Sequence, residues 1–314
     1  MVRYSLLSSS WQVNQLIQED RMDPIIFTIP GTNFSLHWYG VIMAVGIVLA
    51  GMIAEWGVRQ RGGDGEHIWE LLIWGVPFGI VGARLWYVLN DILGGGRYYL
   101  DNPLKIINLP EGGLHFYGAV LFGALGAYIY VKRSKLDFRL FLDAAAPALL
   151  IGQALVRPAN FINQELYGPP TDLPWGIAID AAHRIAPWTD TFLFPVESTR
   201  FHPAFAYEML WNFLAAGILL WIALEYKDKI KPASIFASWL ILEGFGREII
   251  EFFRPDQPRL AGTEISYSRI VAGVMILIGI FWLLIKYEVI KLSFLNPGPN
   301  KYSLPPKARK KKKA

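Results

Sequence analysis

The fold is decided by residues 34–54, which read FSLHWYGVIMAVGIVLAGMIA. This stretch contains no Asp, Glu, Lys or Arg, and it is apolar on nearly every face of a helix. A helix that crosses the hydrocarbon core of a bilayer needs roughly 20 largely apolar residues. The length and composition of this stretch therefore predict a transmembrane helix.

Six further segments are comparably apolar, and with residues 34–54 they predict about seven transmembrane helices in an all-α membrane protein. They are residues 69–91, 114–131, 140–156, 204–224, 233–252 and 268–285. Only 18% of the chain is charged, against about 25% in soluble domains. A large soluble helical core is disfavoured because it would need amphipathic helices. The segment at 140–156 is short and contains Asp143 and Pro147, so a kinked or partly re-entrant helix is expected there.

Basic residues gather after the first, third, fifth and seventh of these segments. They are Arg59, Arg61, Lys132, Arg133, Lys135, Arg139, Lys227, Lys229, Lys231, Lys307, Arg309 and the run 310–313. Loops rich in Lys and Arg stay in the cytoplasm. We therefore expect the amino terminus and the loops near 94–113, 158–203 and 253–267 to lie outside, and the carboxyl terminus to be cytoplasmic. The basic tail is expected to bind anionic membrane lipids rather than nucleic acid, because no nucleic-acid-binding motif accompanies it.

Three regions are expected along the chain. Residues 1–21 form a polar amino-terminal extension, so either Met1 or Met22 is the start; residues 22–291 form the transmembrane domain, and residues 292–314 form the basic cytoplasmic tail. The longest loop, about 158–203, is rich in proline and aromatic residues, which favours a small folded extracytoplasmic cap over disorder. The chain has no cysteine, which excludes disulfides, thiolate metal sites and a thiol nucleophile of its own.

Ionisable side chains within the apolar segments are functional candidates, because burying a charge in a membrane is costly. Arg84, Arg157 and Arg247 stand out for this reason. Glu243, Arg247 and Glu251 are four residues apart and share one helix face, which Arg254 extends.

Arg157 and Asn160 also share a face if their helix continues, although Pro158 favours a new helical start between them. The expected orientation places these arginines toward the outer leaflet. Because the guanidinium fork suits phosphate, the cluster predicts a pocket for an anionic lipid headgroup. The alternative is that each arginine only closes an interhelical salt bridge or reaches the interface.

Five motifs in order resemble those of the prolipoprotein diacylglyceryl transferases over about residues 22–285. They are the pair 22–27 and 36–40, with His37 and Tyr39, then 82–89, 157–165, 202–208 and 247–254. The resemblance implies an enzyme of the bacterial cytoplasmic membrane, with no cofactor. Such an enzyme moves the diacylglyceryl unit of phosphatidylglycerol to the lipobox cysteine thiol of a prolipoprotein. Glycerol phosphate leaves, and a thioether forms.

Carried over residue by residue, the resemblance makes Arg157 and Arg247 the phosphate-binding candidates. The residues implied to shape the pocket or contact the substrate are Tyr39, His37, Arg84, Asn160, Glu165, Glu251 and Arg254. A further motif, residues 112–118 at the third apolar segment, departs from the family pattern, because Tyr117 stands where a histidine is usual. Tyrosine is a poor base at its unperturbed pKa of about 10, and a free thiol has a pKa of about 8.5. Since an arginine-rich pocket would acidify the thiol further, Tyr117 is expected to orient the lipid or the thiol.

The sequence is compatible with one other function and disfavours two more. The departures leave open a catalytically inactive homologue that binds phosphatidylglycerol or lipoprotein precursors. A small transporter or channel is disfavoured because the chain has no internal repeat. A CDP-alcohol phosphotransferase is disfavoured because the sequence has no run of spaced aspartates that would bind a divalent metal.

Overall fold

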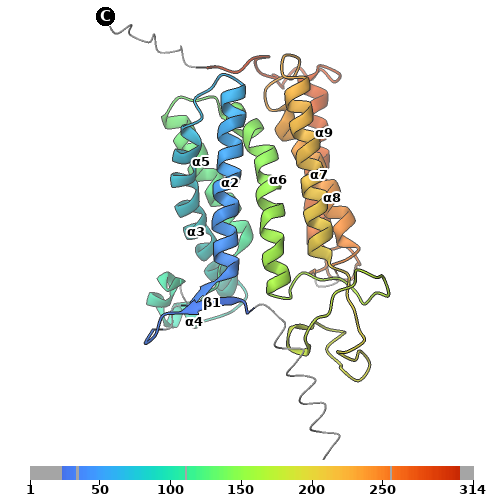
Figure 1. The fold of residues 1–314 in the computed structure, drawn as a ribbon. Coiled ribbons are helices and arrows are strands. Elements are labelled where there is room, and N and C mark those ends of the chain that lie inside the picture. The colour runs from blue at the N-terminus through green and yellow to red at the C-terminus, as the bar shows by residue number, and fades with distance from the viewer. Residues whose placement is uncertain (1–22, 33–34, 110–111, 255–256, 305–314) are drawn as a thin grey trace, which may run out of the picture.

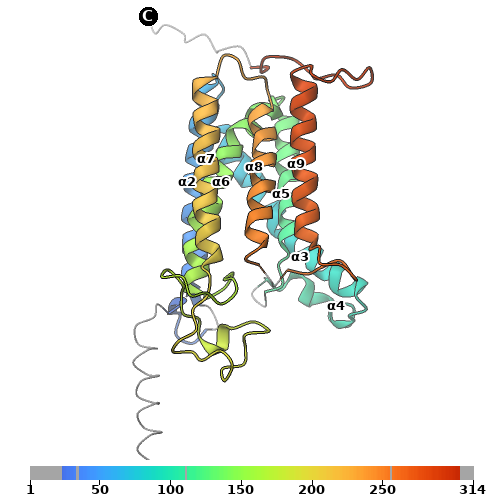
Figure 2. The ribbon, with the colours of Figure 1, turned by 90° about the vertical axis from the view of Figure 1, so that its right-hand side faces the viewer.

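The long helices of the computed structural model stand side by side as one bundle (Figures 1 and 2). The structure describes residues 23–32, 35–109, 112–254 and 257–304. The expectations for the amino-terminal extension, for Met22 and for the final basic run 307–313 concern residues outside these ranges. The described part of the chain is mostly helical, with one small two-stranded sheet.

Seven helices of 18 residues or more lie in the described ranges, one at each segment expected from the sequence. They are α2 (Trp38–Gln60), α3 (His67–Leu93), α5 (Phe116–Arg133), α6 (Phe138–Ile162), α7 (Ala204–Glu225), α8 (Ser234–Glu251) and α9 (Tyr267–Lys286). The short elements are β1 (Ile25–Thr28), β2 (Ser35–His37), α4 (Tyr98–Asp101) and two 3₁₀ turns, Pro103–Ile107 and Ala181–His183. Strands β1 and β2 pair antiparallel just before α2.

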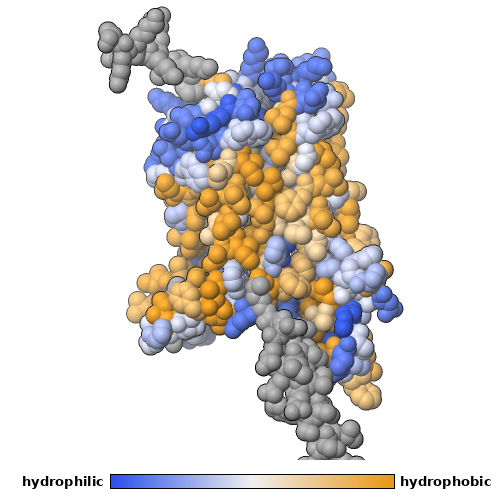
Figure 3. All heavy atoms as spheres, in the orientation of Figure 1, coloured by the Kyte–Doolittle hydropathy of each residue, from blue (hydrophilic) through white to orange (hydrophobic). Residues whose placement is uncertain are grey.

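Five helices in the described ranges are long and apolar enough to cross a membrane, namely α2, α3, α6, α7 and α9. Many of their outward side chains are large and apolar, and Figure 3 shows a band of hydrophobic residues across the middle of the face in view. Helices α5 and α8 have 18 residues each and pack against α3 and α9 respectively. Such a band suits lipid rather than water, so the chain is a multi-pass membrane protein.

Helix α6 is the central helix of the bundle. Half of its most apolar 18-residue window is buried, against 28% or less for the other four membrane-crossing candidates, and it packs against α2, α7 and α8. It runs without interruption for 25 residues through Pro147 and Pro158. Of the two alternatives expected at 140–156, the partly re-entrant helix is therefore wrong, and so is the expected new start at Pro158. Neighbouring helices on several sides support the backbone where proline removes a hydrogen bond.

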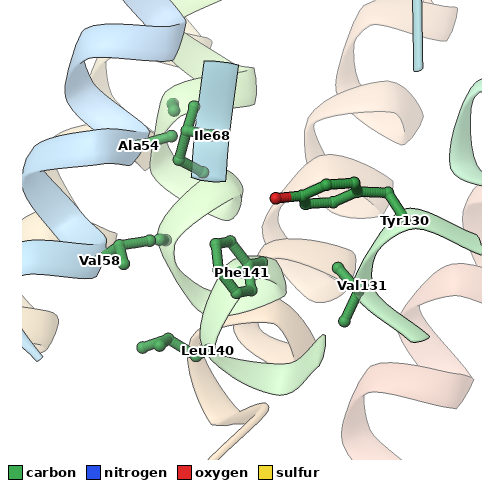
Figure 4. Close-up of a cluster of buried hydrophobic side chains, with 9 residues drawn as sticks. Ala54, Val58, Ile68, Tyr130, Val131, Leu140 and Phe141 are labelled. Atoms are coloured by element: carbon green, nitrogen blue, oxygen red, sulfur yellow. The ribbon is translucent and has the colours of Figure 1, made fainter. Parts of the chain in front are cut away.

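Asp143 shows why a carboxylate is tolerated inside α6. It is fully buried, and its two oxygens accept hydrogen bonds from the backbone N–H groups of Ala233 at 2.6 Å and Phe236 at 2.8 Å. The Tyr302 hydroxyl donates to the same carboxylate at 2.6 Å. Asp143 thus caps the start of α8, next to an apolar cluster that α2, α3, α5 and α6 contribute (Figure 4).

The long loop between α6 and α7 folds around its own apolar centre. Tyr167, Ile179, Trp188 and Phe201 are buried together, and the Tyr167 hydroxyl donates to the carbonyl of His183 at 3.0 Å. We call residues 163–203 the cap, and the end of the bundle next to it the cap end; residues 158–162 belong to α6. Helices α2, α5, α7 and α9 begin at the cap end, and α3, α6 and α8 finish there (Figure 1).

Candidate active site

Arg157 lies near the last turn of α6 and is held from two sides. Its guanidinium forms an ion pair with Glu208 of α7 and donates to Asn160 Oδ1 at 3.3 Å. The second bond exists because α6 continues through Pro158, which keeps Arg157 and Asn160 on one face. The Arg157 and Glu208 side chains are 18% and 17% exposed.

The polar contacts of Arg157 continue into the turn that leaves α6. Asn160 is buried, and its Nδ2 donates to Glu165 Oε1 at 2.9 Å. Tyr39, in the first turn of α2, interacts electrostatically with both Glu165 and Arg157. We call Tyr39, Arg157, Asn160, Glu165 and Glu208 the Arg157 cluster. Four of its five members were predicted from the sequence as site residues.

A second polar cluster joins α8 to α9. Arg247 Nη2 lies 3.0 Å from Glu251 Oε2, one turn along the same helix, and donates to Ser268 Oγ at 3.1 Å. Ser268 in turn donates to Glu251 Oε2 at 2.8 Å. We call Arg247, Glu251 and Ser268 the Arg247 cluster. The spacing of Arg247 and Glu251 was readable from the sequence, whereas nothing in the sequence pointed to Ser268.

Glu243 and Gln153 connect the two clusters across the bundle. Gln153 Nε2 of α6 donates to Glu243 Oε1 of α8 at 3.3 Å. Glu243 also interacts electrostatically with Glu208, Arg157 and Arg247. The two arginines therefore face a shared polar region at the junction of α6, α7 and α8. Each guanidinium is oriented by one carboxylate and keeps part of its surface open, which is the arrangement that can bind an anionic group.

Residues of the cap and of α7 pack together next to Glu208. Tyr207 forms hydrogen bonds with His202 Nδ1 at 3.0 Å and with Trp175 Nε1 at 2.8 Å. The rings of His202 and Tyr207 pack against Phe253 at centroid distances of 5.1 and 5.0 Å. This contact ties the start of α7, the end of α8 and the cap together beside Glu208, the neighbour of Tyr207 in the chain.

Arg84 has a different environment from the other two arginines. It is 4% exposed, and its guanidinium donates to the backbone carbonyls of the loop before α5. The acceptors are the carbonyls of Lys105, Ile106, Asn108, Gly112 and Gly113, at 2.5 to 3.2 Å. A guanidinium has five N–H groups, and loop carbonyls engage all three of its nitrogens. The geometry therefore favours a role in holding this loop over a role in binding substrate.

The remaining predicted residues, Tyr117, His37 and Arg254, lie at the cap end. Tyr117 is the second residue of α5; it is 47% exposed, and its ring lies near that of His115, with the centroids 5.6 Å apart. Among the described residues, its hydroxyl has no hydrogen-bond partner. His37 precedes α2 and has Nδ1 3.1 Å from the carbonyl of Ser35. Arg254 is buried just after α8.

Glu208, Gln153 and Glu243 belong to the polar region but were absent from the predicted site, although the helical spacing of Glu243 had been noted. Glu208 belongs to a motif that was recognised, but its pairing with Arg157 required the packing of α7 on α6. Gln153 is a neutral side chain one turn before Arg157 and gave no signal of charge. Within the described ranges, no group of three His, Cys, Asp or Glu side chains is arranged to hold a metal ion.

Comparison with known proteins gives one consistent result. A family model described as prolipoprotein diacylglyceryl transferase matches residues 24–285. Three relatives named phosphatidylglycerol–prolipoprotein diacylglyceryl transferase illustrate the similarity. The protein of Chloroflexus aggregans is 35% identical over 243 residues, which cover 74% of this chain and 78% of the relative. That of Leifsonia xyli subsp. xyli is 33% identical over 86% of this chain and 80% of the relative. That of Clostridium botulinum strain Langeland is 31% identical over 85% of this chain and 99% of the relative.

Proposed function

Because the chain belongs to the prolipoprotein diacylglyceryl transferase family, we propose that it transfers the diacylglyceryl group of phosphatidylglycerol to the lipobox cysteine thiol of prolipoproteins. The reaction forms a thioether and releases glycerol phosphate, and it serves lipoprotein maturation. The observation that carries the proposal for this chain is the pair of carboxylate-held arginines, Arg157 and Arg247, on either side of one polar region.

The departing phosphate sets the main electrostatic demand of this reaction. Charge builds up on the phosphate oxygens as the carbon–oxygen bond breaks, and preorganised cations lower the free energy of that transition state. In our proposal Arg157 and Arg247 bind the phosphate from the two sides of the polar region. Glu208 and Glu251 hold the two guanidinium groups in place before the lipid arrives, so little reorganisation is needed.

The other members of the site position the lipid. Asn160 and Glu165 form the wall next to Arg157, and Tyr39 lies within reach of both charges. Tyr117 stands at the exposed start of α5, where its hydroxyl can orient a lipid or a thiol that enters from the membrane. His37 and Arg254 complete the rim of the site at the cap end.

The site requires a defined orientation in the bacterial cytoplasmic membrane. We propose that α5 and α8 cross with the other five long helices, that the amino terminus and the cap are extracytoplasmic, and that the carboxyl terminus is cytoplasmic. Supporting this, the lysines and arginines that follow α2, α5 and α7 all lie at the end of the bundle opposite the cap. The two arginine clusters then lie at the depth of the outer-leaflet headgroups.

The proposal is tested by incubating the purified full-length protein with phosphatidylglycerol vesicles and a synthetic lipobox peptide. The expected result is a peptide whose mass has increased by one diacylglyceryl unit. A peptide with serine in place of the lipobox cysteine is the matched control and should keep its mass. A protein that binds phosphatidylglycerol and the cysteine peptide but leaves the peptide mass unchanged is an inactive homologue, which would overturn the proposal.

A further inference from the structure

The polar region contains four buried atoms with no hydrogen-bond partner among the described residues. They are Gln153 Oε1, Arg157 Nε, Asn212 Nδ2 and Glu243 Oε2. They come from three neighbouring helices: Gln153 lies one turn before Arg157 on α6, Asn212 one turn after Glu208 on α7, and Glu243 one turn before Arg247 on α8. An unpartnered polar atom in a membrane interior is costly. We therefore expect the polar groups of a bound molecule to form hydrogen bonds with these atoms between α6, α7 and α8.

Among the described residues, Glu243 differs from the other carboxylates of the site in that its unpartnered oxygen is buried. Glu208 is engaged by Arg157, and Glu251 by Arg247 and Ser268. Glu243 forms no ion pair with any described residue; Gln153 Nε2 holds its Oε1 at 3.3 Å, and its Oε2 stays free. A carboxylate with one oxygen fixed and the other free has the geometry of a proton acceptor.

The position of Glu243 along the bundle fits the chemistry of the lipid. In phosphatidylglycerol the carbon that is attacked belongs to the diacylglyceryl unit and lies on the acyl side of the phosphate. With the phosphate at Arg157 and Arg247, that carbon points away from the cap end, toward the bilayer centre. Glu243 and Gln153 are each four residues farther from the cap end than these arginines, which is about 6 Å at a helical rise of about 1.5 Å per residue.

The direction of nucleophilic attack also places the thiol on the side of the arginines where Glu243 lies. A sulfur nucleophile displaces the phosphate from the side opposite the breaking carbon–oxygen bond. The thiol must therefore lie beyond the reacting carbon, farther from the arginines than that carbon is. Tyr117 is half-exposed at the start of α5 and has no hydrogen bond that leads to this position.

We propose that Glu243, held by Gln153, accepts the proton of the lipobox thiol; this inference rests on the proposed function. The proton passes from sulfur to Glu243 Oε2, and the electron pair of the S–H bond stays on sulfur. The thiolate forms the carbon–sulfur bond while the carbon–oxygen bond to phosphate breaks. The bonding pair leaves on the phosphate oxygen, where Arg157 and Arg247 offset its charge. The proton leaves Glu243 with the glycerol phosphate or to solvent.

The test first removes the carboxylate of Glu243 and then supplies a peptide whose nucleophile needs no base. General-base groups contribute about 100- to 10,000-fold to rate, so Glu243→Gln should reduce transfer to the cysteine peptide by about 100-fold or more. A selenocysteine peptide carries a far more acidic nucleophile that is already ionised at neutral pH. With this peptide, kept reduced, Glu243→Gln should recover most of the wild-type rate. With the cysteine peptide, the rate of Glu243→Asp should lie between the rates of the wild type and of Glu243→Gln.

Two controls separate the base from other roles. Arg157→Ala should be impaired with both peptides, because phosphate departure is unchanged by the nucleophile. Glu248→Gln alters a neighbouring carboxylate of α8 that pairs with Arg269 at 3.0 Å, outside both clusters, and should leave both rates unchanged. Gln153→Leu should lose about tenfold with the cysteine peptide and recover with the selenocysteine peptide, as expected for a positioning residue.

Three outcomes would overturn the assignment. One is near-wild-type activity of Glu243→Gln with the cysteine peptide, and another is equal loss with both peptides in a variant that still binds phosphatidylglycerol. If Glu243→Gln does not insert, Glu243→Asp takes its place, and a defect of Glu243→Asp that the selenocysteine peptide fails to reduce counts equally against the proposal. Inactivity of the wild-type protein would instead contradict the proposed function itself.

Discussion

Arg157 of α6 and Glu208 of α7 form an interhelical ion pair in which only 18% and 17% of the two side chains are exposed. The pair fixes the guanidinium, and Asn160 adds a second restraint at 3.3 Å. Removing one member of such a pair leaves the other charge without its partner in a poorly solvated place. Arg157 is therefore oriented by the fold itself, before any lipid is bound.

Arg157→Ala and Arg247→Ala are each expected to abolish measurable transfer while the protein still inserts. Losing two or more charge-assisted bonds to phosphate costs about 3 kcal/mol or more, which corresponds to a rate loss of more than about a hundredfold. Lysine should rescue poorly at either position, because a point charge does not reproduce the fork of donors. The measurement is the initial rate of peptide lipidation per unit of inserted protein; near-normal rates in both alanine variants would make these arginines structural.

Arg84 should behave differently. Arg84→Lys is expected to destabilise the protein by roughly 3 kcal/mol or more, since one ammonium cannot replace bonds from a charged donor to several carbonyls, each worth about 1.5–3 kcal/mol. Thermal unfolding in detergent measures this effect. The rate per folded molecule should stay within about threefold of wild type. A Tm equal to that of wild type, combined with a large loss of rate, would instead indicate that Arg84 binds substrate.

The positions of the helices could be predicted from the sequence because lipid imposes a simple rule. Every apolar segment of about 20 residues became a helix, as a backbone in hydrocarbon requires. The partly re-entrant helix that Asp143 and Pro147 suggested does not form, for a tertiary reason. Asp143 is satisfied by backbone N–H groups at the start of α8 and by Tyr302, which lies 159 residues away in the chain, and no local pattern contains that information.

The site was predictable only to the extent that it lies on single helices. The spacing of Arg247 and Glu251 gave their contact directly. The spacing of Arg157 and Asn160 gave theirs only on the condition that the helix continues through Pro158, which it does. The sequence did not distinguish Arg84, whose charge is taken up by loop carbonyls, from Arg157, whose charge faces the polar region. Gln153 and Ser268 are neutral side chains that matter through what lies opposite them, which only packing decides.

The segment after α9 is expected to stabilise the end of the bundle opposite the cap. Tyr302 donates to the buried Asp143 at 2.6 Å, and Ser303 N donates to Asp137 Oδ2 at 2.8 Å. A hydrogen bond to a charged group contributes about 1.5–3 kcal/mol, so Tyr302→Phe should lower the free energy of unfolding by about that amount. Tyr226→Phe, at an exposed residue of the same end, is the matched control and should change little.

The same contacts predict a pH dependence. Burial alone would raise the pKa of Asp137, but hydrogen bonds from Arg139 and Ser303 and the charge of Arg139 outweigh it and hold that pKa below the usual range. A carboxyl whose pKa is lowered in the folded state increases the free energy of unfolding. This contribution has its full size at pH values above the unfolded-state pKa of about 3.9. That contribution should disappear as the pH falls from about 4 through the folded-state pKa. Asp137→Asn should flatten this part of the unfolding curve; an unchanged curve would show that Asp137 does not contribute.

The orientation predicts the behaviour of fusions to a reporter that is active only outside the cytoplasm. A fusion after Lys313 should be silent, because the basic carboxyl-terminal segment is held inside. A fusion after Lys229, between α7 and α8, should also be silent, whereas one after Asp172 in the cap should be active. Activity after Lys313 or Lys229 would invert the orientation and move the arginine clusters to the inner leaflet.

Tyr117→Phe separates an orienting hydroxyl from a base at the position where the family usually has histidine. The change keeps the ring, which packs near His115, and removes a hydroxyl that has no hydrogen-bond partner among the described residues. We expect a loss of about tenfold, typical of losing one orienting hydrogen bond of about 1–1.5 kcal/mol, with an unchanged pH–rate profile.

His115→Gln should also leave that profile unchanged, because neither side chain takes the thiol proton in our account. The measurement is the rate of peptide lipidation from neutral to alkaline pH in the wild type and the two variants. A complete loss in Tyr117→Phe, together with wild-type activity that rises only at alkaline pH, would identify tyrosinate as the base. In that case Glu243 would have no proton to accept, and the thiol would have to approach from the α5 side of the bundle.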